Sequence, residues 1–165
     1  MRPQLTAIAL LLSAASAGAI TGNAPPATGW AARPIVMLID ARGDLCTGTA
    51  LTRDLVLTAA HCVTLPIAYR VRTFQDGETI AVRSVARHPR FNMAAYSASR
   101  ATADVALVKL TAPLPAIVVP ASLGAARRVA VGETMTVAGF GVTKAGTPLG
   151  LGQPLHIQFY KWLYQ

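Results

Sequence analysis

Short runs of apolar, largely β-branched residues are the feature that most constrains the fold of this chain. Glycine, proline, asparagine and aspartate separate the runs, as at Gly43, Asp76, Gly77 and Gly132. Many short strands at such a spacing predict an antiparallel sandwich or barrel, and no long amphipathic helix interrupts the pattern. We therefore expect strands over residues 34–39, 55–58, 67–71, 79–85, 105–110, 116–119 and 133–138.

The first 19 residues have the composition of a secretory signal peptide. Arg2 gives a positively charged start, residues 7–12 form an apolar run, and Ala15, Ala17 and Ala19 offer two small-residue cleavage sites. The run is too short to cross a bilayer, which takes about 20 residues. We therefore expect a chain that is secreted to the periplasm or the cell exterior and is cleaved after Ala17 or Ala19.

Composition bounds the remaining classes. A chain of 165 residues with 53% hydrophobic residues is long and apolar enough for one domain with a packed core. The net charge of +8 is compatible with nucleic acid or an anionic membrane as a partner. However, the arginines are spread along the chain and do not alternate with aromatic residues as in single-strand binders. A solvated basic surface is therefore favoured, without nucleic acid and without a membrane span.

Two cysteines, Cys46 and Cys62, allow one disulfide, as an even count in a secreted chain suggests. Such a bridge closes a short loop and is worth about 3 kcal/mol in the chain-entropy model. The alternative is a metal site that also uses His61. It is the weaker reading because zinc sites need more closely paired cysteines and more ligands, so we expect neither a metal nor a cofactor.

Residues 57–62, Leu-Thr-Ala-Ala-His-Cys, are the strongest candidate for chemistry. The alanines permit a tight turn after a strand, and Cys62 can fix that turn to a neighbouring strand. A histidine fixed in this way suits a general base, for which geometry comes before pKa.

Asp104 is the matching acidic candidate because it precedes an alternating apolar strand. A carboxylate near the core needs a partner, and the Nδ1–H of an imidazole would satisfy it and fix the tautomer. The remaining aspartates lie among turn or polar residues and are interpreted as exposed: Asp40, Asp44, Asp54 and Asp76.

Residues 58–62, Thr-Ala-Ala-His-Cys, resemble the active-site histidine motif of the trypsin-like (chymotrypsin-fold, S1 family) serine proteases. Four further segments resemble that family in the same order: Cys-Thr-Gly-Thr-Ala-Leu at 46–51, His-Pro-Arg-Phe-Asn at 88–92, Asp-Val-Ala-Leu-Val-Lys-Leu at 104–110 and Thr-Val-Ala-Gly-Phe-Gly at 136–141. Thr47 replaces the usual glycine, and Phe140 replaces a tryptophan. The resemblance implies an all-β fold of antiparallel barrels, with the first barrel and the start of the second in residues 20–141.

The resemblance also implies roles for single residues. His61 would be the general base, Asp104 would orient it, and Cys46 would be bridged to Cys62. Ile20 would be the mature N-terminus whose amine switches the site on, although Thr21 and Asn23 depart from the family's Ile-Val-Gly-Gly start. Proteins or peptides would be the substrates, and no sequence feature sets an oligomeric state.

The family nucleophile lies in Gly-Asp-Ser-Gly-Gly, which this sequence does not contain. None of its serines after the expected signal peptide lies in a glycine-rich turn that would form an oxyanion hole: Ser84, Ser97, Ser99 and Ser122. The resemblance thus implies a secreted serine endopeptidase whose 165 residues are inactive alone. The alternative is a non-catalytic secreted binding module on the same barrel, against which the retention of His61 and Asp104 argues.

Residues 142–165 change in composition, from a Gly, Pro and Thr-rich stretch to a cluster of aromatic residues. We expect an atypical tail that does not continue the β pattern. Such a tail favours an enzyme cut short by a frameshift, a premature stop or a gene-model error.

Overall fold

The computed structural model describes residues 29–73, 77–124, 130, 132–140 and 155–161. The expected signal peptide at residues 1–19 and the expected mature N-terminus at Ile20 lie outside the described residues. The same is true of residues 142–154 and 162–165 in the C-terminal segment.

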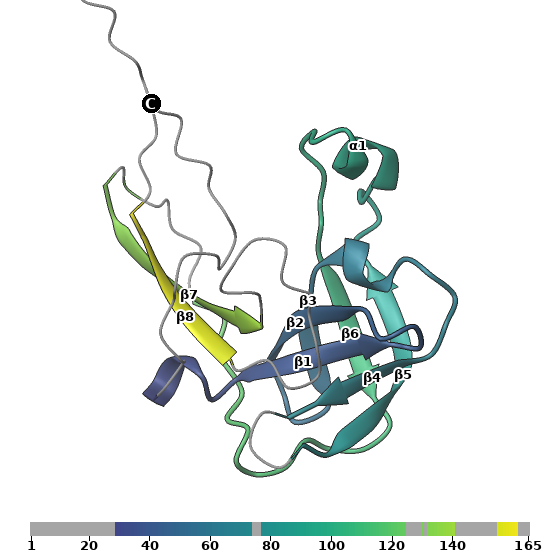
Figure 1. Ribbon diagram of the computed structural model, residues 1–165, viewed down its shortest axis with the longest axis vertical. Coiled ribbons are helices and arrows are strands. Elements are labelled where there is room, and N and C mark those ends of the chain that lie inside the picture. Colours follow the sequence, from purple (N-terminus) through teal and green to yellow (C-terminus); the bar gives the residue numbers. More distant parts are fainter. Residues whose placement is uncertain (1–28, 74–76, 125–129, 131, 141–154, 162–165) are drawn as a thin grey trace, which may run out of the picture.

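Six antiparallel strands close into a barrel (Figure 1). In chain order they are β1 (Ile35–Asp40), β2 (Leu45–Ala50), β3 (Leu55–Thr58), β4 (Tyr69–Arg72), β5 (Thr79–Arg87) and β6 (Ala106–Leu110). Around the barrel the order is β1-β2-β3-β6-β5-β4. The all-β fold and the complete first barrel expected from the sequence are confirmed.

Alternation of side chains along the strands fills the barrel. In β6, Ala106, Val108 and Leu110 are buried while the residues between them face outward, as the period of two in a strand requires. β1 is buried on both faces: Val36 and Leu38 face the barrel core, whereas Ile35 and Met37 pack in a second cluster with Phe140. The largest fully buried side chains of the described residues are Leu38, Leu114, Val36, Val56, Val71 and Val108.

The expected strand at residues 116–119 is wrong, because this segment forms a turn in which the Val118 N–H donates to the carbonyl of Pro115 at 3.0 Å. Prolines at 113, 115 and 120 provide no N–H group for a β-ladder, so the segment cannot pair regularly. Its apolar residues have a different use, since Leu114 and Val118 are buried in the barrel core.

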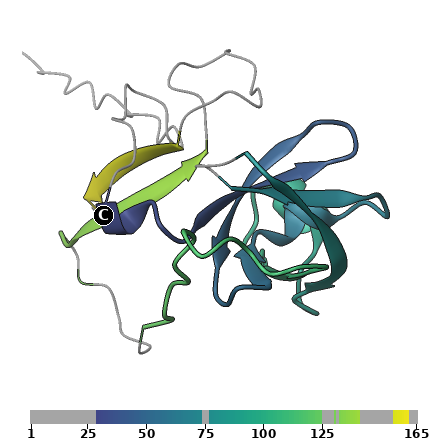
Figure 2. The same ribbon diagram turned by 90° about the horizontal axis from the view of Figure 1, so that it is seen from below.

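A second, two-stranded sheet lies beside the barrel and consists of β7 (Thr134–Phe140) and β8 (Leu155–Lys161) (Figure 2). The two strands are antiparallel, with Thr134 opposite Lys161 and Phe140 opposite Leu155. The expectation that the aromatic C-terminal segment leaves the β pattern is therefore wrong for residues 155–161. Isoleucine, phenylalanine and tyrosine in this stretch are themselves strand formers, which outweighs the change in composition.

Thr47 connects the barrel to this second sheet. Its hydroxyl accepts from the Phe140 N–H at 2.9 Å and lies 3.4 Å from the Phe140 carbonyl oxygen. The carbonyl of Thr47 in turn accepts from the hydroxyl of the buried Thr58 at 2.9 Å. The ring of Phe140 packs with Ala32, Ile35 and Met37, so the junction is both polar and apolar. The departure from glycine at Thr47 thus provides a hydroxyl that a glycine cannot.

Three short helical segments complete the described fold: η1 (Gly29–Ala31), η2 (Ala60–Val63) and α1 (Met93–Ser97). α1 is at the end of an excursion between β5 and β6 that projects from the barrel (Figure 1). Within the described residues, no helix has the length and apolar character that crossing a membrane requires.

Gly48 allows close packing inside the barrel. A Cβ atom at this position would lie 2.5 Å from Cγ1 of Val56 and 3.2 Å from Cγ2 of Val36. We predict that Gly48→Ala lowers the free energy of unfolding by about 1–3 kcal/mol, the usual range for overpacking a core. Urea denaturation measures this, with Gly124→Ala as the matched control because no atom lies within 4 Å of its Cβ. Equal stability of the two variants would contradict the prediction.

Candidate active site

The end of β3 positions His61 at one end of the barrel. After Thr58 the backbone stays extended through Ala59, with φ −78° and ψ 144°, and then enters the turn η2. Ala60 is completely buried, and the Cys62 N–H donates to the Ala59 carbonyl at 3.2 Å. The small side chain of Ala60 therefore lets the turn sit tightly on the core, while the next residue points to the surface.

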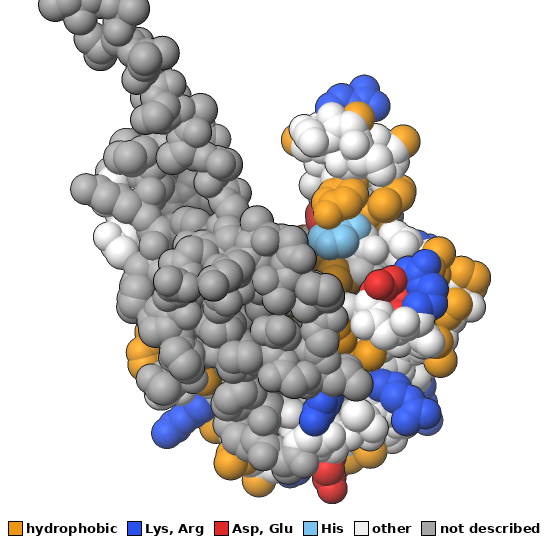
Figure 3. Space-filling view, in the orientation of Figure 1, with side chains coloured by type: hydrophobic (Ala, Val, Ile, Leu, Met, Phe, Trp, Pro, Cys, Tyr) orange, Lys and Arg blue, Asp and Glu red, His pale blue; other side chains and the backbone are white. Residues whose placement is uncertain are grey.

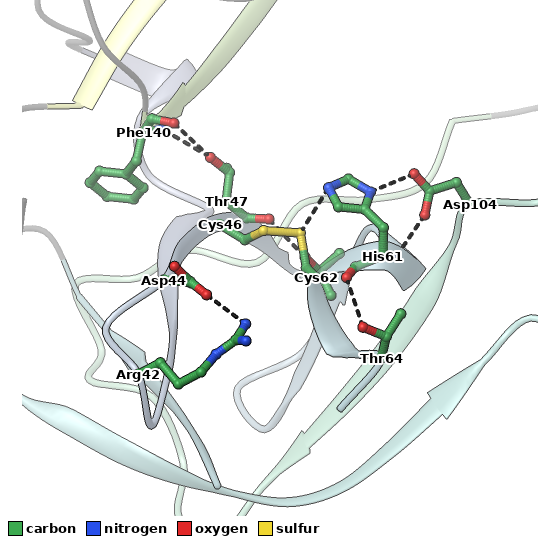
Figure 4. The surroundings of a disulfide bond; sticks show 10 residues. Arg42, Asp44, Cys46, Thr47, His61, Cys62, Thr64, Asp104 and Phe140 are labelled. Carbon is green, nitrogen blue, oxygen red and sulfur yellow. Dashed lines mark hydrogen bonds and ion pairs between the residues drawn. A yellow bond between two sulfur atoms is a disulfide. The ribbon is translucent and has the colours of Figure 1, made fainter. Parts of the chain in front are cut away.

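Cys46 on β2 and Cys62 on η2 form a disulfide across a sequence separation of 16 residues (Figure 4). The disulfide expected from the sequence is therefore present. The metal alternative fails at this point. The ligand atoms of Cys46, His61 and Cys62 lie within 4.8 Å of one another, but both sulfurs are consumed by the bond and neither is a thiolate.

Both carboxylate oxygens of Asp104 contact His61 (Figure 4). Oδ2 lies 2.7 Å from the ring nitrogen Nδ1, and Oδ1 accepts from the backbone N–H of His61 at 2.8 Å. A carboxylate is an acceptor, so Nδ1 carries the proton and the neutral ring keeps its lone pair on Nε2. One side chain therefore fixes the position of the backbone, the orientation of the ring and its tautomer.

The pKa of Asp104 lies below its usual value. Partial burial is the largest single influence and raises the pKa. The hydrogen bonds from the His61 ring and from the backbone of His61 and Ala60, together with the charge that the ring carries whenever it is protonated, lower it by more. The carboxyl group therefore stays ionised where it faces the ring.

The outer side of the His61 ring remains accessible. Its side chain is 32% exposed, and Nε2 lies 3.5 Å from Sγ of Cys62. In the space-filling view, histidine atoms occupy the notch between the barrel and the α1 projection (Figure 3). His61 also lines a cavity of about 280 Å³, with the disulfide, Leu65 and Tyr69 in its wall.

The hairpin between β1 and β2 also borders this cavity. At its tip the Arg42 guanidinium bridges the carboxylates of Asp40 at 3.2 Å and Asp44 at 2.6 Å. Arg42 and Asp44 are largely exposed, so this pair contributes shape to the cavity rim more than stability.

Tyr96 on α1 is a site residue that the sequence did not reveal. Its ring stacks on the His61 imidazole, with 4.5 Å between ring centroids and 13° between ring planes. No periodic pattern or spacing marks Tyr96, since α1 has only five residues and their contacts depend on how the excursion folds back.

The structure brings Cys46, His61, Cys62 and Asp104 together. It does not bring a serine to His61: among the described residues, no serine hydroxyl makes a hydrogen bond with the imidazole. Ser97 lies in α1, and Ser99 follows it with a positive φ of 54°.

In a comparison with protein families, residues 20–158 match the family described as Trypsin. The matched range contains the whole barrel, β7 and the first part of β8.

We predict that the double variant Cys46→Ser/Cys62→Ser loses about 3 kcal/mol of free energy of unfolding, the entropic value for a loop of about 15 residues. Chemical denaturation of the oxidised wild type and the double variant measures it. Dithiothreitol should lower the wild-type midpoint and leave that of the variant unchanged. A reductant effect of equal size on both proteins would contradict the prediction.

The lowered pKa of Asp104 predicts a pH dependence of stability. A carboxyl group that is more acidic in the folded chain stabilises the fold above its unfolded pKa, which is about 3.9. That contribution is lost as the pH falls through the lower folded value. We therefore predict that wild type is more stable than Asp104→Asn at pH 7, and that the difference shrinks steadily below about pH 5.

Urea denaturation of both proteins between pH 7 and pH 3 measures this difference. The other carboxylates are common to both proteins, so their titration cancels. A difference that stays constant or grows between pH 5 and pH 3 would contradict the assignment.

Proposed function

Because the chain belongs to the trypsin family, a family of serine peptidases, we propose that its barrel carries the general-base half of a serine endopeptidase active site. In that role His61 accepts a proton at Nε2 from the attacking hydroxyl, and Asp104 holds the imidazole in the tautomer that can do so. The substrates are proteins or peptides.

The 2.7 Å contact between Nδ1 of His61 and Oδ2 of Asp104 is the observation that carries this proposal. The second hydrogen bond, from Oδ1 to the His61 backbone, supports it because it fixes the ring relative to the barrel. A binding module on the same scaffold gains nothing from an ionised Asp104 that orients a partly exposed imidazole.

We further propose that the protein acts outside the reducing cytosol. Trypsin-like domains are usually secreted, and residues 1–19 have the composition of a signal peptide. The Cys46–Cys62 disulfide supports export, since such bonds persist in oxidising compartments. The family match begins at Ile20, the residue proposed as the mature N-terminus.

The nucleophile of this reaction does not come from residues 1–165 in our proposal, because none of their serines lies in a glycine-rich turn. A histidine and an aspartate without a nucleophile and an oxyanion hole have no hydroxyl to activate. We therefore predict that this polypeptide by itself hydrolyses peptide and ester substrates no faster than buffer. Turnover that is abolished by His61→Ala would overturn this prediction.

The general-base role is tested by joining the barrel to a second barrel that carries the nucleophilic serine and the oxyanion hole. A chimaera joins residues 20–140 to the second barrel of an active trypsin-family peptidase that carries the serine. We expect peptidase activity that falls about 10⁴-fold on Asp104→Asn and at least as far on His61→Ala.

His88→Ala is the matched control in the chimaera. Nδ1 of His88 accepts a hydrogen bond from the Arg90 backbone N–H, and no carboxylate of the described residues pairs with its ring, so its loss should leave the activity unchanged. A folded chimaera that is inactive, or that is equally active with His61→Ala, would overturn the proposal in favour of a binding module.

A further inference from the structure

Tyr96 covers one face of the imidazole that the proposed mechanism requires. The two rings are nearly parallel, 13° apart, with centroids at 4.5 Å. Offset stacking of aromatic rings at this distance is worth about 0.5–1.5 kcal/mol beyond the area that it buries. The contact therefore favours one ring plane for His61 over others.

The excursion that carries Tyr96 is ordered by its own hydrogen bonds. The Asn92 side chain caps α1 by accepting from the Ala95 N–H at 2.9 Å. The Thr102 hydroxyl accepts from the Asn92 N–H at 2.8 Å and donates to the Arg90 carbonyl at 3.3 Å, which joins the two ends of the excursion. These hydrogen bonds define the local shape of the excursion around α1.

The position of α1 against the barrel is a separate matter. None of its five residues is buried, and among the described residues its hydrogen bonds stay within residues 92–100. Phe91 at the base of the excursion packs against the core, whereas the tip projects outward (Figure 1). Tyr96 on His61 is thus the ring contact that holds the tip over the candidate site.

His61 needs this contact because its other restraints act at its edges. Asp104 holds Nδ1, and Nε2 lies against the Cys62 sulfur at 3.5 Å, a weak interaction. Neither restrains movement perpendicular to the ring plane, and the His61 side chain is 32% exposed. A ring that swings outward would break the alignment of Nδ1 with the carboxylate.

We propose that Tyr96 is a positioning residue for His61, and that the stack couples the imidazole to α1 in both directions. Tyr96 keeps the ring in the plane in which Asp104 can hold it, and the ring keeps α1 over the site. The hydroxyl of Tyr96 has no hydrogen-bond partner among the described residues, so the aromatic face alone supplies the effect. This inference deepens the proposed function, on which its catalytic meaning rests.

The first test is spectroscopic and uses the full chain. In wild type, the Tyr96 ring protons should give nuclear Overhauser contacts to the His61 ring, whose protons should be displaced by the Tyr96 ring current. Tyr96→Phe should preserve the displacement, and Tyr96→Ala should remove it. Absence of the contacts in wild type would overturn the proposal even if a variant failed to fold.

The second test measures how strongly the stack with His61 holds α1 against the barrel. Arg100 is exposed at the end of the excursion, so cleavage after it by an arginine-specific protease reports how often α1 leaves the barrel. We expect Tyr96→Ala and His61→Ala each to raise the cleavage rate about two- to twelvefold, which is the stacking energy expressed as a population. Tyr96→Phe should cleave at the wild-type rate.

Met93→Ala is the matched control, because it removes another exposed apolar side chain from the same helix. Its cleavage rate and its His61 resonances should equal those of wild type. The proposal is overturned if Tyr96→Phe behaves like Tyr96→Ala, if His61→Ala leaves cleavage unchanged, or if Met93→Ala matches Tyr96→Ala.

Neither readout requires catalysis, so the two proposals fail separately. An intact stack with a chimaera indifferent to His61→Ala would refute the peptidase role alone. A chimaera that depends on His61, with no coupling between Tyr96 and the imidazole, would refute the positioning role alone.

Discussion

The pairing of β3 with β6 is the constraint on which the candidate site depends. In their antiparallel register Thr58, the last residue of β3, lies opposite Ala106, the first residue of β6. The chain leaves β3 and enters β6 at the same end of the barrel, so residues 61 and 104 meet although 43 positions separate them. Because a slip of one residue would exchange the buried and exposed faces of β6, the buried alternation of Ala106, Val108 and Leu110 also fixes the geometry of the site.

The disulfide and the Asp104 carboxylate then act on the same short turn. The disulfide of Cys62 attaches η2 to β2. The Asp104 carboxylate, just before β6, accepts from the backbone N–H of His61 in the same turn, so the turn is bound at two different strands. Because the backbone of His61 is held at both points, the conformational entropy of this residue is lost when the chain folds, and no further loss is required when the reaction begins. That is the form of preorganisation that a general base requires.

Sequence patterns predicted the parts of this arrangement that are set by local chemistry. The apolar runs predicted five of the six barrel strands, whereas β2 was indicated only by the family resemblance of residues 46–51. The order of motifs around His61 and Asp104 predicted which residues meet. The turn at residues 116–119 was missed because its apolar residues were interpreted as a strand. Leu114 and Val118 are apolar because they pack in the barrel core, and the segment does not pair with another strand. The strand β8 was missed because a cluster of aromatic residues was interpreted as a break in pattern, although strands favour such residues.

Tyr96 was missed for a different reason. Its contact with His61 depends on how the whole excursion between β5 and β6 folds back over the barrel. A single stacked contact leaves no periodic trace in sequence. Thr47 lies between these cases: its departure from the family pattern was visible, but its bond to Phe140 depends on where β7 lies. Departures from a family motif therefore mark positions of interest without saying what they contact.

The exposure of the site sets how strongly its charges act. The side chains of His61 and Asp104 are 32% and 25% exposed, so water screens their attraction in the described structure. The hydrogen bonds fix direction, whereas the strength of the charge interaction depends on the local dielectric. A substrate or polypeptide that covers the open side of the imidazole would remove this water and strengthen the pull of Asp104 on the ring, without moving either residue. Positioning by Asp104 and Tyr96 therefore has to come first, since excluding water strengthens an aligned pair and does little for a misaligned one.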